Sequence, residues 1–388
     1  MSSTNSTAQK QPYRIAVIGA GICGRMMAWR LQTAGLQVEL FDNNANQHMS
    51  GASAVAAGML SPYSELEHSD SLVFQLGLQS LSLWPKLVSE LDCSNVLNSN
   101  GTLLVAHKED EHLLKHFEHI LTHKQREHDI TINKLNAHQL ANYEPLLAEK
   151  FSSALLLPNE ASVEPQAILK QLAEKFLAAG GRWHYKQSVT EVTGGNVHVN
   201  GRSQPFNWVV DCRGLGAREA IKGLRGVRGE LLVLRAKNIP INYQVRLMHP
   251  RYQLYLVPRL SCQQLVIGAT QIESENEGSI SVRSALELLS AAYSLHHNFA
   301  DAEVLASHAQ LRPAFTDQLP KICHRDQLTL INGLYRHGIL LAPIITQMAT
   351  QSILRQLNDN PCDEKMVSNT LAEQVEFFNS NKVFAYEH

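Results

Sequence analysis

The start of this chain constrains its fold more than any other segment. A short β-branched apolar run, Arg14–Ile18, is followed directly by Gly19-Ala-Gly-Ile-Cys-Gly24. Apolar side chains then recur at helical spacing over Arg25–Ala34, and a second apolar run, Val38–Phe41, ends at Asp42. A strand, a glycine turn, a helix and a second strand within about 30 residues predict a Rossmann-type βαβ unit, which is a dinucleotide site.

Each residue of the glycine turn has a separate physical role. Gly19 permits the tight turn, Gly21 lets the backbone approach a pyrophosphate, and Gly24 lets the helix pack closely on the strand. The free N–H groups at the helix N-terminus suit phosphate oxygens. Asp42 can accept hydrogen bonds from ribose hydroxyls and disfavours a 2′-phosphate. The pattern therefore predicts a dinucleotide other than NADP.

A second small-residue stretch, Gly51–Leu60, is unusually rich in Gly and Ala. Backbone without bulky side chains can lie flat against a large planar ligand, although a close helix–sheet contact would use the same residues. Further glycine turns occur near residues 58, 214 and 338. A single cofactor that touches all of them must be large, which favours FAD over a nicotinamide.

Composition restricts the partners. The 388 residues include 34 basic and 36 acidic side chains, so the chain lacks the basic charge of a general nucleic-acid binder. No apolar run approaches the roughly 20 residues that cross a bilayer. Residues 1–12 are polar, without the apolar core of a signal peptide, and are predicted to be a disordered tail of a cytoplasmic protein.

Neither the cysteines nor the histidines predict a metal site. The six cysteines are scattered without a Cys-x-x-Cys pair, so they are interpreted as free thiols. His112, His116, His119 and His123 fall on one face of a helix predicted over residues 107–128. Their charged neighbours favour a solvated face over metal ligands.

The rest of the chain alternates helices and strands. Apolar periodicity predicts helices over residues 71–91, 166–179, 283–296 and about 344–357. Strands are predicted around Val227–Leu234, Tyr252–Val257 and Leu265–Ala269, in an antiparallel sheet, and at Leu328–Ile331.

Together these motifs resemble flavoenzymes of the D-amino-acid oxidase superfamily, specifically the glycine oxidase type of the thiamine pathway. The resemblance extends from about Tyr13 to Leu357. The matching segments are Gly19–Gly24, Asp42, Ser53–Leu60, Val189, Asp211–Gly214, Val227–Glu230, Tyr255–Arg259, Val266–Thr270, Leu311–Pro313 with Asp317 and Pro320, and Tyr335–Pro343.

The resemblance implies non-covalent FAD, because Gln310 occupies the position where sarcosine-oxidase relatives place a flavin-linking cysteine. Besides the glycine turn and Asp42, the implied FAD contacts are Ser53, Ala57, Gly58, Met59, Leu60, Val189, Gly214, Arg312, Arg336, Gly338, Ile339 and Leu340.

The resemblance also implies an activity, which is oxidative deamination of glycine or another small amino acid or amine. Hydride passes to flavin N5, the imine hydrolyses to a 2-oxo acid and ammonia, and O2 reoxidises the flavin to give H2O2. Arg312 would clamp the substrate carboxylate, Tyr255 would donate a hydrogen bond to it, and Arg336 would lie beside flavin and substrate. A structural ion pair, a cross-strand aromatic and a phosphate or surface contact are the respective alternatives.

The predicted substrate pocket contains Met59, Gln253 and Gln271. Gln253 stands where glycine oxidase has a pocket His, and Gln271 stands where it has a pocket Met. Thr346 and Cys323 replace two glycines, so glycine itself is in doubt as the substrate. Glu65 and Glu67 are interpreted as exposed.

Three alternatives to the oxidase remain open. They are a dehydrogenase that uses a quinone or carrier acceptor, a modified-nucleoside oxidase, and a flavin-binding homologue that acts in maturation or interaction. The near-neutral charge argues against the nucleoside oxidase and fits a zwitterionic small substrate. A homo-oligomer also remains open.

The predicted fold is an α/β Rossmann-like, doubly wound FAD-binding domain with an α+β substrate domain that contains a mostly antiparallel sheet. The predicted boundaries are 13–75, 151–220 and 307–388 for the first domain, and 76–150 and 221–306 for the second.

Overall fold

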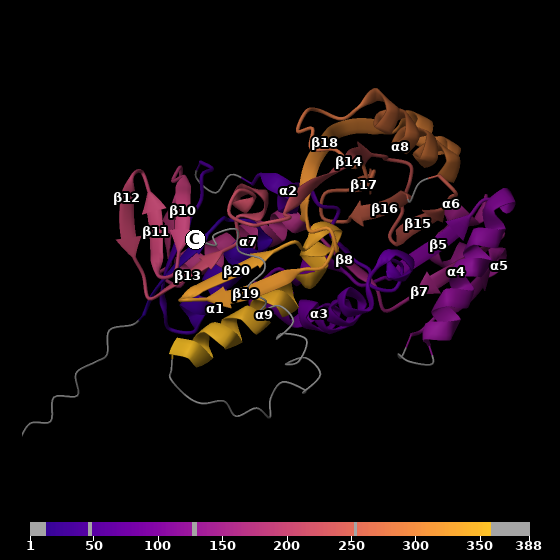
Figure 1. Cartoon of the computed structure of the whole chain (residues 1–388). Helices are drawn as coiled ribbons and strands as arrows, with labels where there is room; N and C mark the ends of the chain where they lie inside the picture. Colours follow the sequence, from indigo (N-terminus) through magenta and orange to yellow (C-terminus); the bar gives the residue numbers. More distant parts are fainter. Residues whose placement is uncertain (1–12, 46–48, 126–129, 252–253, 358–388) are drawn as a thin grey trace, which may run out of the picture.

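The structure is a computed structural model that describes residues 13–45, 49–125, 130–251 and 254–357. Two large sheets lie side by side in it, one in the part that contains the N-terminal βαβ unit and one beside α8 and α4 (Figure 1). No helix within the described ranges has both the length and the apolar character needed to span a lipid bilayer. The predicted combination of a Rossmann-like domain and a mostly antiparallel sheet is confirmed.

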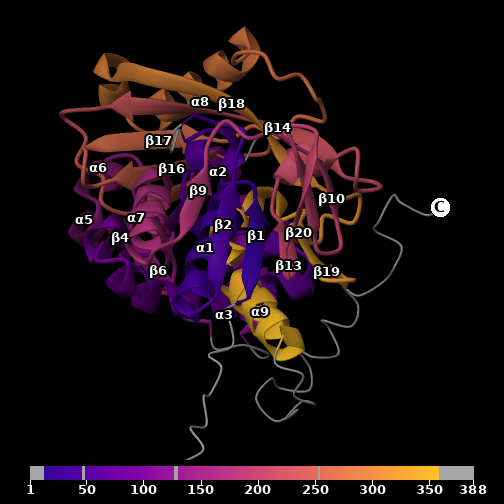
Figure 2. The same ribbon diagram turned by 90° about the vertical axis from the view of Figure 1, so that its left-hand side faces the viewer.

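The first sheet has six strands in the order β19-β20-β13-β1-β2-β9. All neighbours pair in parallel except β19, which runs antiparallel to β20 (Figure 2). Its strands are β1 (Arg14–Ile18), β2 (Gln37–Phe41), β9 (Arg182–His184), β13 (Trp208–Asp211), β19 (Lys321–Arg325) and β20 (Leu328–Asn332).

Side-chain alternation in β1 explains how this sheet is covered on both faces. Ile15 and Val17 pack into a core with the helices, whereas Ala16 and Ile18 pack against a small antiparallel sheet on the other face. The helices are α1 (Ile22–Thr33), α3 (Ser71–Glu90), α7 (Pro165–Ala178) and α9 (Gly338–Leu357). The small sheet comprises β10 (Val189–Thr193), β11 (Asn196–Val199) and β12 (Arg202–Pro205).

Helix α9 begins at Gly338, six residues before the predicted start at Ile344. Pro343 therefore lies inside the helix, where it cannot donate a backbone hydrogen bond. Ser80, buried in α3, bridges this turn: its hydroxyl donates to the Leu340 carbonyl and accepts from the Ile344 N–H at 3.4 Å. Packing of α3 on α9 therefore stabilises the helix across its proline.

The second sheet has eight strands in the order β18-β14-β17-β16-β15-β5-β7-β6. Every neighbouring pair is antiparallel except β15 with β5. The strands are β18 (Glu303–Ala314), β14 (Arg225–Arg235), β17 (Gln264–Gly268), β16 (Leu254–Arg259), β15 (Gln244–Met248), β5 (Thr102–Ala106), β7 (Ser153–Leu157) and β6 (Asn133–Asn136).

Helices cover different parts of this sheet. One face forms a core with α8 (Val282–Leu295), α5 (Ala137–Tyr143) and α6 (Pro145–Ala148), and α4 (Glu111–Lys124) covers the far end of the other face. The remaining elements are the short helix α2 (Gly51–Val55) and a three-stranded sheet of β3 (Met59–Leu60), β8 (Ala161–Val163) and β4 (Leu97–Asn98). Of the helix predicted over residues 107–128, the structure describes α4 and a preceding 3-10 turn at Lys108–Asp110, while residues 126–128 lie outside the described ranges; the four histidines are exposed.

The packing shifts the predicted domain boundaries in three places. Helix α3 belongs to the core of the six-stranded sheet, although residues from 76 onwards were assigned to the substrate domain. Strands β7 and β18 belong to the eight-stranded sheet, although residues 151–220 and 307–388 were assigned to the FAD domain. Local periodicity identifies a strand but not the sheet that it joins, which causes these errors.

Candidate active site

A cavity of about 1490 Å³ extends between the two large sheets. It exceeds the roughly 300–1,000 Å³ that is usual for a small-molecule pocket, so it has room for a large cofactor together with a substrate. Its wall combines the glycine turn after β1, the Gly51–Met59 segment, the end of β18 and the start of α9. Segments more than 300 residues apart therefore meet around one space.

The glycine turn is built as the sequence predicts. Gly19 has φ +91°, and a Cβ there would lie 2.7 Å from the Cys212 carbonyl oxygen. A Cβ on Gly24 would overlap the Gly19 carbonyl, so Gly24 acts in packing and does not line the cavity. Gly21 does line the cavity and caps α1 without a side chain. The backbone at the N-terminus of α1 is therefore open toward a phosphate.

Asp42 lies at the end of β2 and lines the cavity. Its Oδ2 accepts from the Ala20 N–H at 2.7 Å, and its Oδ1 accepts from the Asn44 N–H at 2.8 Å. A carboxylate has about four acceptor positions, so Asp42 keeps capacity for a ribose hydroxyl while it holds the turn. Nearby, the Ser53 hydroxyl accepts from the Ile22 N–H at 3.1 Å, which joins α2 to the start of α1.

The other predicted cofactor residues fall into two groups. A Cβ on Gly58 would overlap the Val163 carbonyl oxygen, so this position requires glycine. Leu60 is fully buried in the core and does not line the cavity, which corrects its assignment as an FAD contact. The residues that do line the cavity are Ser53, Ala57, Gly58, Met59, Val189, Gly214, Arg312, Arg336, Gly338, Ile339 and Leu340.

This donor set fits FAD. One end offers a glycine cradle and the N-terminus of α1, and the other offers the start of α9, where Gly338, Ile339 and Leu340 line the cavity directly after a 3-10 turn at Tyr335–His337. A helix N-terminus favours negative charge. The contacts of individual residues with FAD remain predictions.

The substrate side of the cavity is one face of the eight-stranded sheet. Arg312 in β18 lies opposite Val227 in β14, and Tyr255 in β16 lies opposite Gly268 in β17. Because alternate residues share a face, Arg312 and Tyr255 point to the same side of the sheet. Gln271 follows β17 and also lines the cavity, whereas Gln253 lies outside the described residues.

Arg312 has the setting expected of an anion-binding residue. Its Nη1 donates to the Thr270 carbonyl at 3.2 Å, and no carboxylate of the described chain lies within salt-bridge distance. Gly229 faces the Arg312 guanidinium, and a Cβ at Gly229 would displace that guanidinium. Within the described residues, the structure therefore shows no ion pair that would support the structural alternative for this residue. Burial raises the pKa of Tyr255 to about 12, so its phenol keeps the proton that it would donate.

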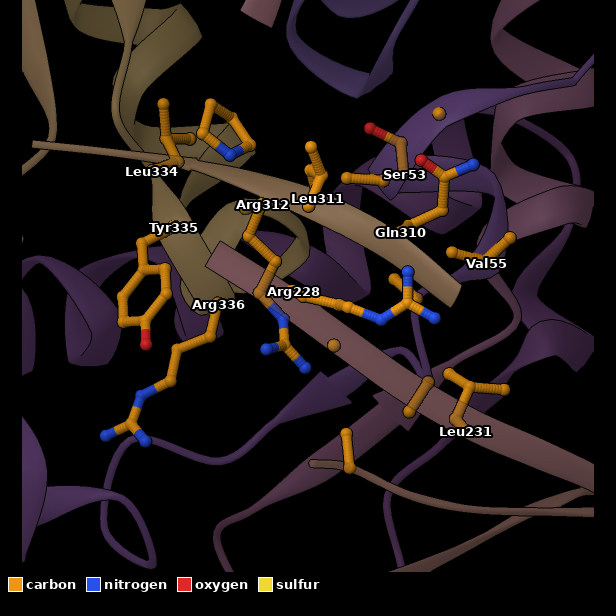
Figure 3. A pocket seen from close by; sticks show the side chains of 18 of the residues that line it. Ser53, Val55, Arg228, Leu231, Gln310, Leu311, Arg312, Leu334, Tyr335 and Arg336 are labelled. Atoms are coloured by element: carbon orange, nitrogen blue, oxygen red, sulfur yellow. The ribbon is translucent and has the colours of Figure 1, made fainter. Parts of the chain in front are cut away.

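Arg336 extends toward the same side of the pocket as Arg312 (Figure 3). Its Nη2 lies 3.1 Å from the Glu65 carboxylate, and its Nε donates to His337 Nε2 at 3.3 Å. The Glu65 side chain is only 19% exposed, so the expectation of an exposed Glu65 is wrong. Burial lowers the pKa of His337 to about 4, which leaves its Nε2 free to accept.

Sequence reasoning missed several polar residues of the cavity. Arg246, in a strand that was not predicted, is nearly buried and lies 3.7 Å from Glu67. Arg228 forms a buried ion pair with Glu230 on the opposite face of β14 from Arg312. Alternating apolar residues in Gln244–Met248 were the available signal for this strand, but five residues without a turn signature did not distinguish it from a loop.

The two residues that replace glycines of glycine oxidase, Thr346 and Cys323, do not reach the cavity wall. Thr346 is buried in α9, where its hydroxyl donates to the Ala342 carbonyl at 2.7 Å. Cys323 is buried in β19 against Phe315 and Leu330. Neither residue lines the cavity, so their replacement of glycine affects packing rather than the site.

Comparison with known proteins supports this interpretation of the cavity. The model of the FAD dependent oxidoreductase family, DAO, matches residues 14–352. The chain belongs to this family. It is 35% identical over 343 residues to a protein of Rhizobium etli named as the thiamine biosynthesis oxidoreductase ThiO, which covers 88% of this chain and 97% of that protein.

Glycine oxidases are further relatives of this family member. Glycine oxidase of Geobacillus kaustophilus is 28% identical over 364 residues, covering 89% of this chain and 93% of the enzyme. The crystal structure of glycine oxidase from Geobacillus kaustophilus superimposes with a TM-score of 0.77 and 26% identity, over 88% of this chain and 95% of that one. The chain is therefore a FAD-dependent oxidoreductase of the glycine oxidase and ThiO type.

Proposed function

We propose that this flavoenzyme oxidises the carbon–nitrogen bond of a small amino acid or amine, with O2 as the electron acceptor. The name of the glycine oxidase relatives supports an amino-acid substrate. The observation that carries the proposal is Arg312, a cavity-lining guanidinium with no carboxylate of the described chain in reach. A planar guanidinium binds two carboxylate oxygens at once, so Arg312 suits the carboxylate that every amino acid carries.

The neighbouring side chains complete a site for an amino acid. Tyr255 shares the sheet face with Arg312 and stays protonated, so it donates to the same carboxylate. Arg336 is held by Glu65 and His337 at the cavity wall, where its guanidinium would lie beside flavin and substrate. When bound, FAD supplies the two-electron acceptor for the hydride of the substrate. The residues of this chain only bind, orient and exclude water.

The N-terminus of α9 adds an electrostatic contribution. Gly338, Ile339 and Leu340 in its first turn line the cavity, and the positive end of the helix dipole there favours negative charge that develops nearby during oxidation. The first turn carries no acidic residue, so nothing in that turn offsets this field.

Flavin bleaching tests the proposal. The holoenzyme would be mixed anaerobically with glycine, sarcosine, D-amino acids and small amines, and the loss of flavin absorbance followed. We expect one class of these amines to reduce the flavin, and Arg312→Met to lose the amino acids that wild type oxidises while it retains FAD. Arg235→Met, a surface variant, is the matched control. If no amine bleaches the flavin, the proposal is wrong; slow reoxidation in air would replace O2 with another acceptor.

A further inference from the structure

Arg246 occupies a place on the substrate face that the proposed reaction does not use. In the register of β15 and β16 it lies directly opposite Tyr255. Directly opposed residues have Cβ atoms about 5 Å apart on one face of a sheet. The face that carries Arg312 and Tyr255 therefore continues to Arg246, so this second guanidinium is next to the proposed carboxylate site.

The guanidinium of Arg246 is buried but sparsely bonded. Its side chain is only 4% exposed and lines the cavity. It donates to the Ser64 carbonyl, lies over the Phe117 ring with 5.0 Å to the centroid, and approaches Glu67 at 3.7 Å, beyond hydrogen-bond range. By contrast, Arg213 contacts both oxygens of Asp211, at 3.0 and 2.7 Å. A guanidinium has five N–H donors, so Arg246 has capacity for an anion.

A buried carboxyl group behind Arg246 holds it in place. Glu160 is fully buried, and its Oε1 accepts from the Ser64 N–H at 2.7 Å, which fixes the residue whose carbonyl receives Arg246. Burial raises the pKa of Glu160 to about 7, so this group carries less than a full negative charge near neutral pH. It therefore positions Arg246 without fully neutralising it.

The formal charges of the site leave room for an additional anion. Arg312, Arg336 and Arg246 contribute three positive charges, Glu65 and Glu67 contribute two negative ones, and the partly ionised Glu160 behind Arg246 adds a fraction of a third. A zwitterionic amino acid adds no net charge. The remaining excess of positive charge favours a second carboxylate on the substrate over a second positive group.

We propose that Arg246 forms a second anion subsite, so that the substrate is an amine with two carboxylates. One carboxylate binds at Arg312 and Tyr255, and the other at Arg246. This inference rests on the proposed function, because it assumes that the first carboxylate is held at Arg312.

Inert carboxylates test the subsite without turnover. The perturbation of the FAD absorbance spectrum would be titrated with malonate, succinate and glutarate, and with acetate, propionate and butyrate as matched ligands of one charge. A charge-assisted hydrogen bond predicts that the best dicarboxylate binds about tenfold to a hundredfold tighter than its matched monocarboxylate. In Arg246→Met this preference should vanish while monocarboxylate affinity is kept, and Arg246→Lys should restore part of it.

The outcomes separate the two proposals. If monocarboxylates bind and an amino acid bleaches the flavin, but wild type shows no preference for dicarboxylates, the subsite is wrong and the proposed function stands. A preference that persists in Arg246→Met also overturns the subsite. If no carboxylate perturbs the flavin and no amine reduces it, the proposed function fails first. Should Arg246→Met not fold, the wild-type comparison alone decides, and Arg235→Met controls for loss of a surface charge.

Discussion

Gly229 determines the space available to the Arg312 guanidinium. A Cβ at Gly229 would lie 2.5 Å from Arg312 Nη1 and nearer still to Cζ and Nη2. The backbone there is not left-handed, so alanine fits the strand and should not destabilise it. Because the clash is with the end of a flexible side chain, Gly229→Ala should move the guanidinium and leave the fold and the FAD content unchanged.

The size of the effect follows from the interaction that is lost. A hydrogen bond between charged groups contributes about 1.5–3 kcal/mol, so displacing Arg312 should raise KM for an amino acid roughly tenfold to a hundredfold. An amine without a carboxylate should be unaffected. Stopped-flow flavin reduction measures both, and FAD absorbance with thermal melting confirms that the variant is folded and loaded.

A double-mutant cycle makes this prediction specific. Gly229→Ala should cost nothing further in an Arg312→Met background, because its only target is already gone. Gly226→Ala is the control, since that glycine lies on the opposite face of β14 and its Cβ would meet Leu311 instead. Unchanged amino-acid affinity in Gly229→Ala, or an equal loss with and without Arg312, would refute the reasoning.

Three further predictions concern the cofactor and a buried carboxyl. Gly21→Val should fold, because a Cβ at this position makes only ordinary contact with the Ser53 hydroxyl at 3.4 Å. The variant should lose FAD on gel filtration, because the γ-methyl groups of valine enter the cavity. A normal flavin spectrum would contradict this prediction. The raised pKa of Glu160, about 7 against an ordinary 4.5, means that its contribution to stability is complete below pH 4.5 and is lost as pH rises through 7. Glu160→Gln should therefore gain about 3 kcal/mol relative to wild type between pH 4.5 and 8 in denaturant melts, and a constant difference would argue against the shift. Acid precipitation should leave the yellow colour in solution, since Gln310 offers no thiol for a flavin bond; colour in the pellet would show covalent FAD.

Local signals made the dinucleotide end of the molecule predictable. Gly19, Gly21 and Asp42 act within one βαβ unit, so their spacing alone places them in space. The start of α9 was not predictable in this way, because the helix passes through Pro343 only with help from Ser80, more than 250 residues earlier. Propensity treats the proline as a break, and the tertiary contact overrides it.

The substrate side was predictable by resemblance but not by pattern. Arg312 and Tyr255 were identified through their motifs, whereas Arg246 lies in a short strand without a turn signal and gains its position from pairing with β16 and β5. Glu65 was expected to be exposed because a single carboxylate carries no sign of the arginine that it meets, Arg336, which is about 270 residues away. Contacts of this range are set by topology.

The strand order of the six-stranded sheet also determines when, during synthesis, the sheet and the cavity beside it can assemble. β1 pairs with β2 soon after both are made, but its other neighbour, β13, follows roughly two hundred residues later, and β20 later still. At about 5–20 residues per second, β1 has one open edge for some tens of seconds on the ribosome. The cavity wall that needs both Gly19 and Gly338 does not exist until residue 338 has been synthesised. The complete cofactor site therefore forms only after that point, and the nascent chain exposes an apolar strand edge that is vulnerable to aggregation until β13 is made.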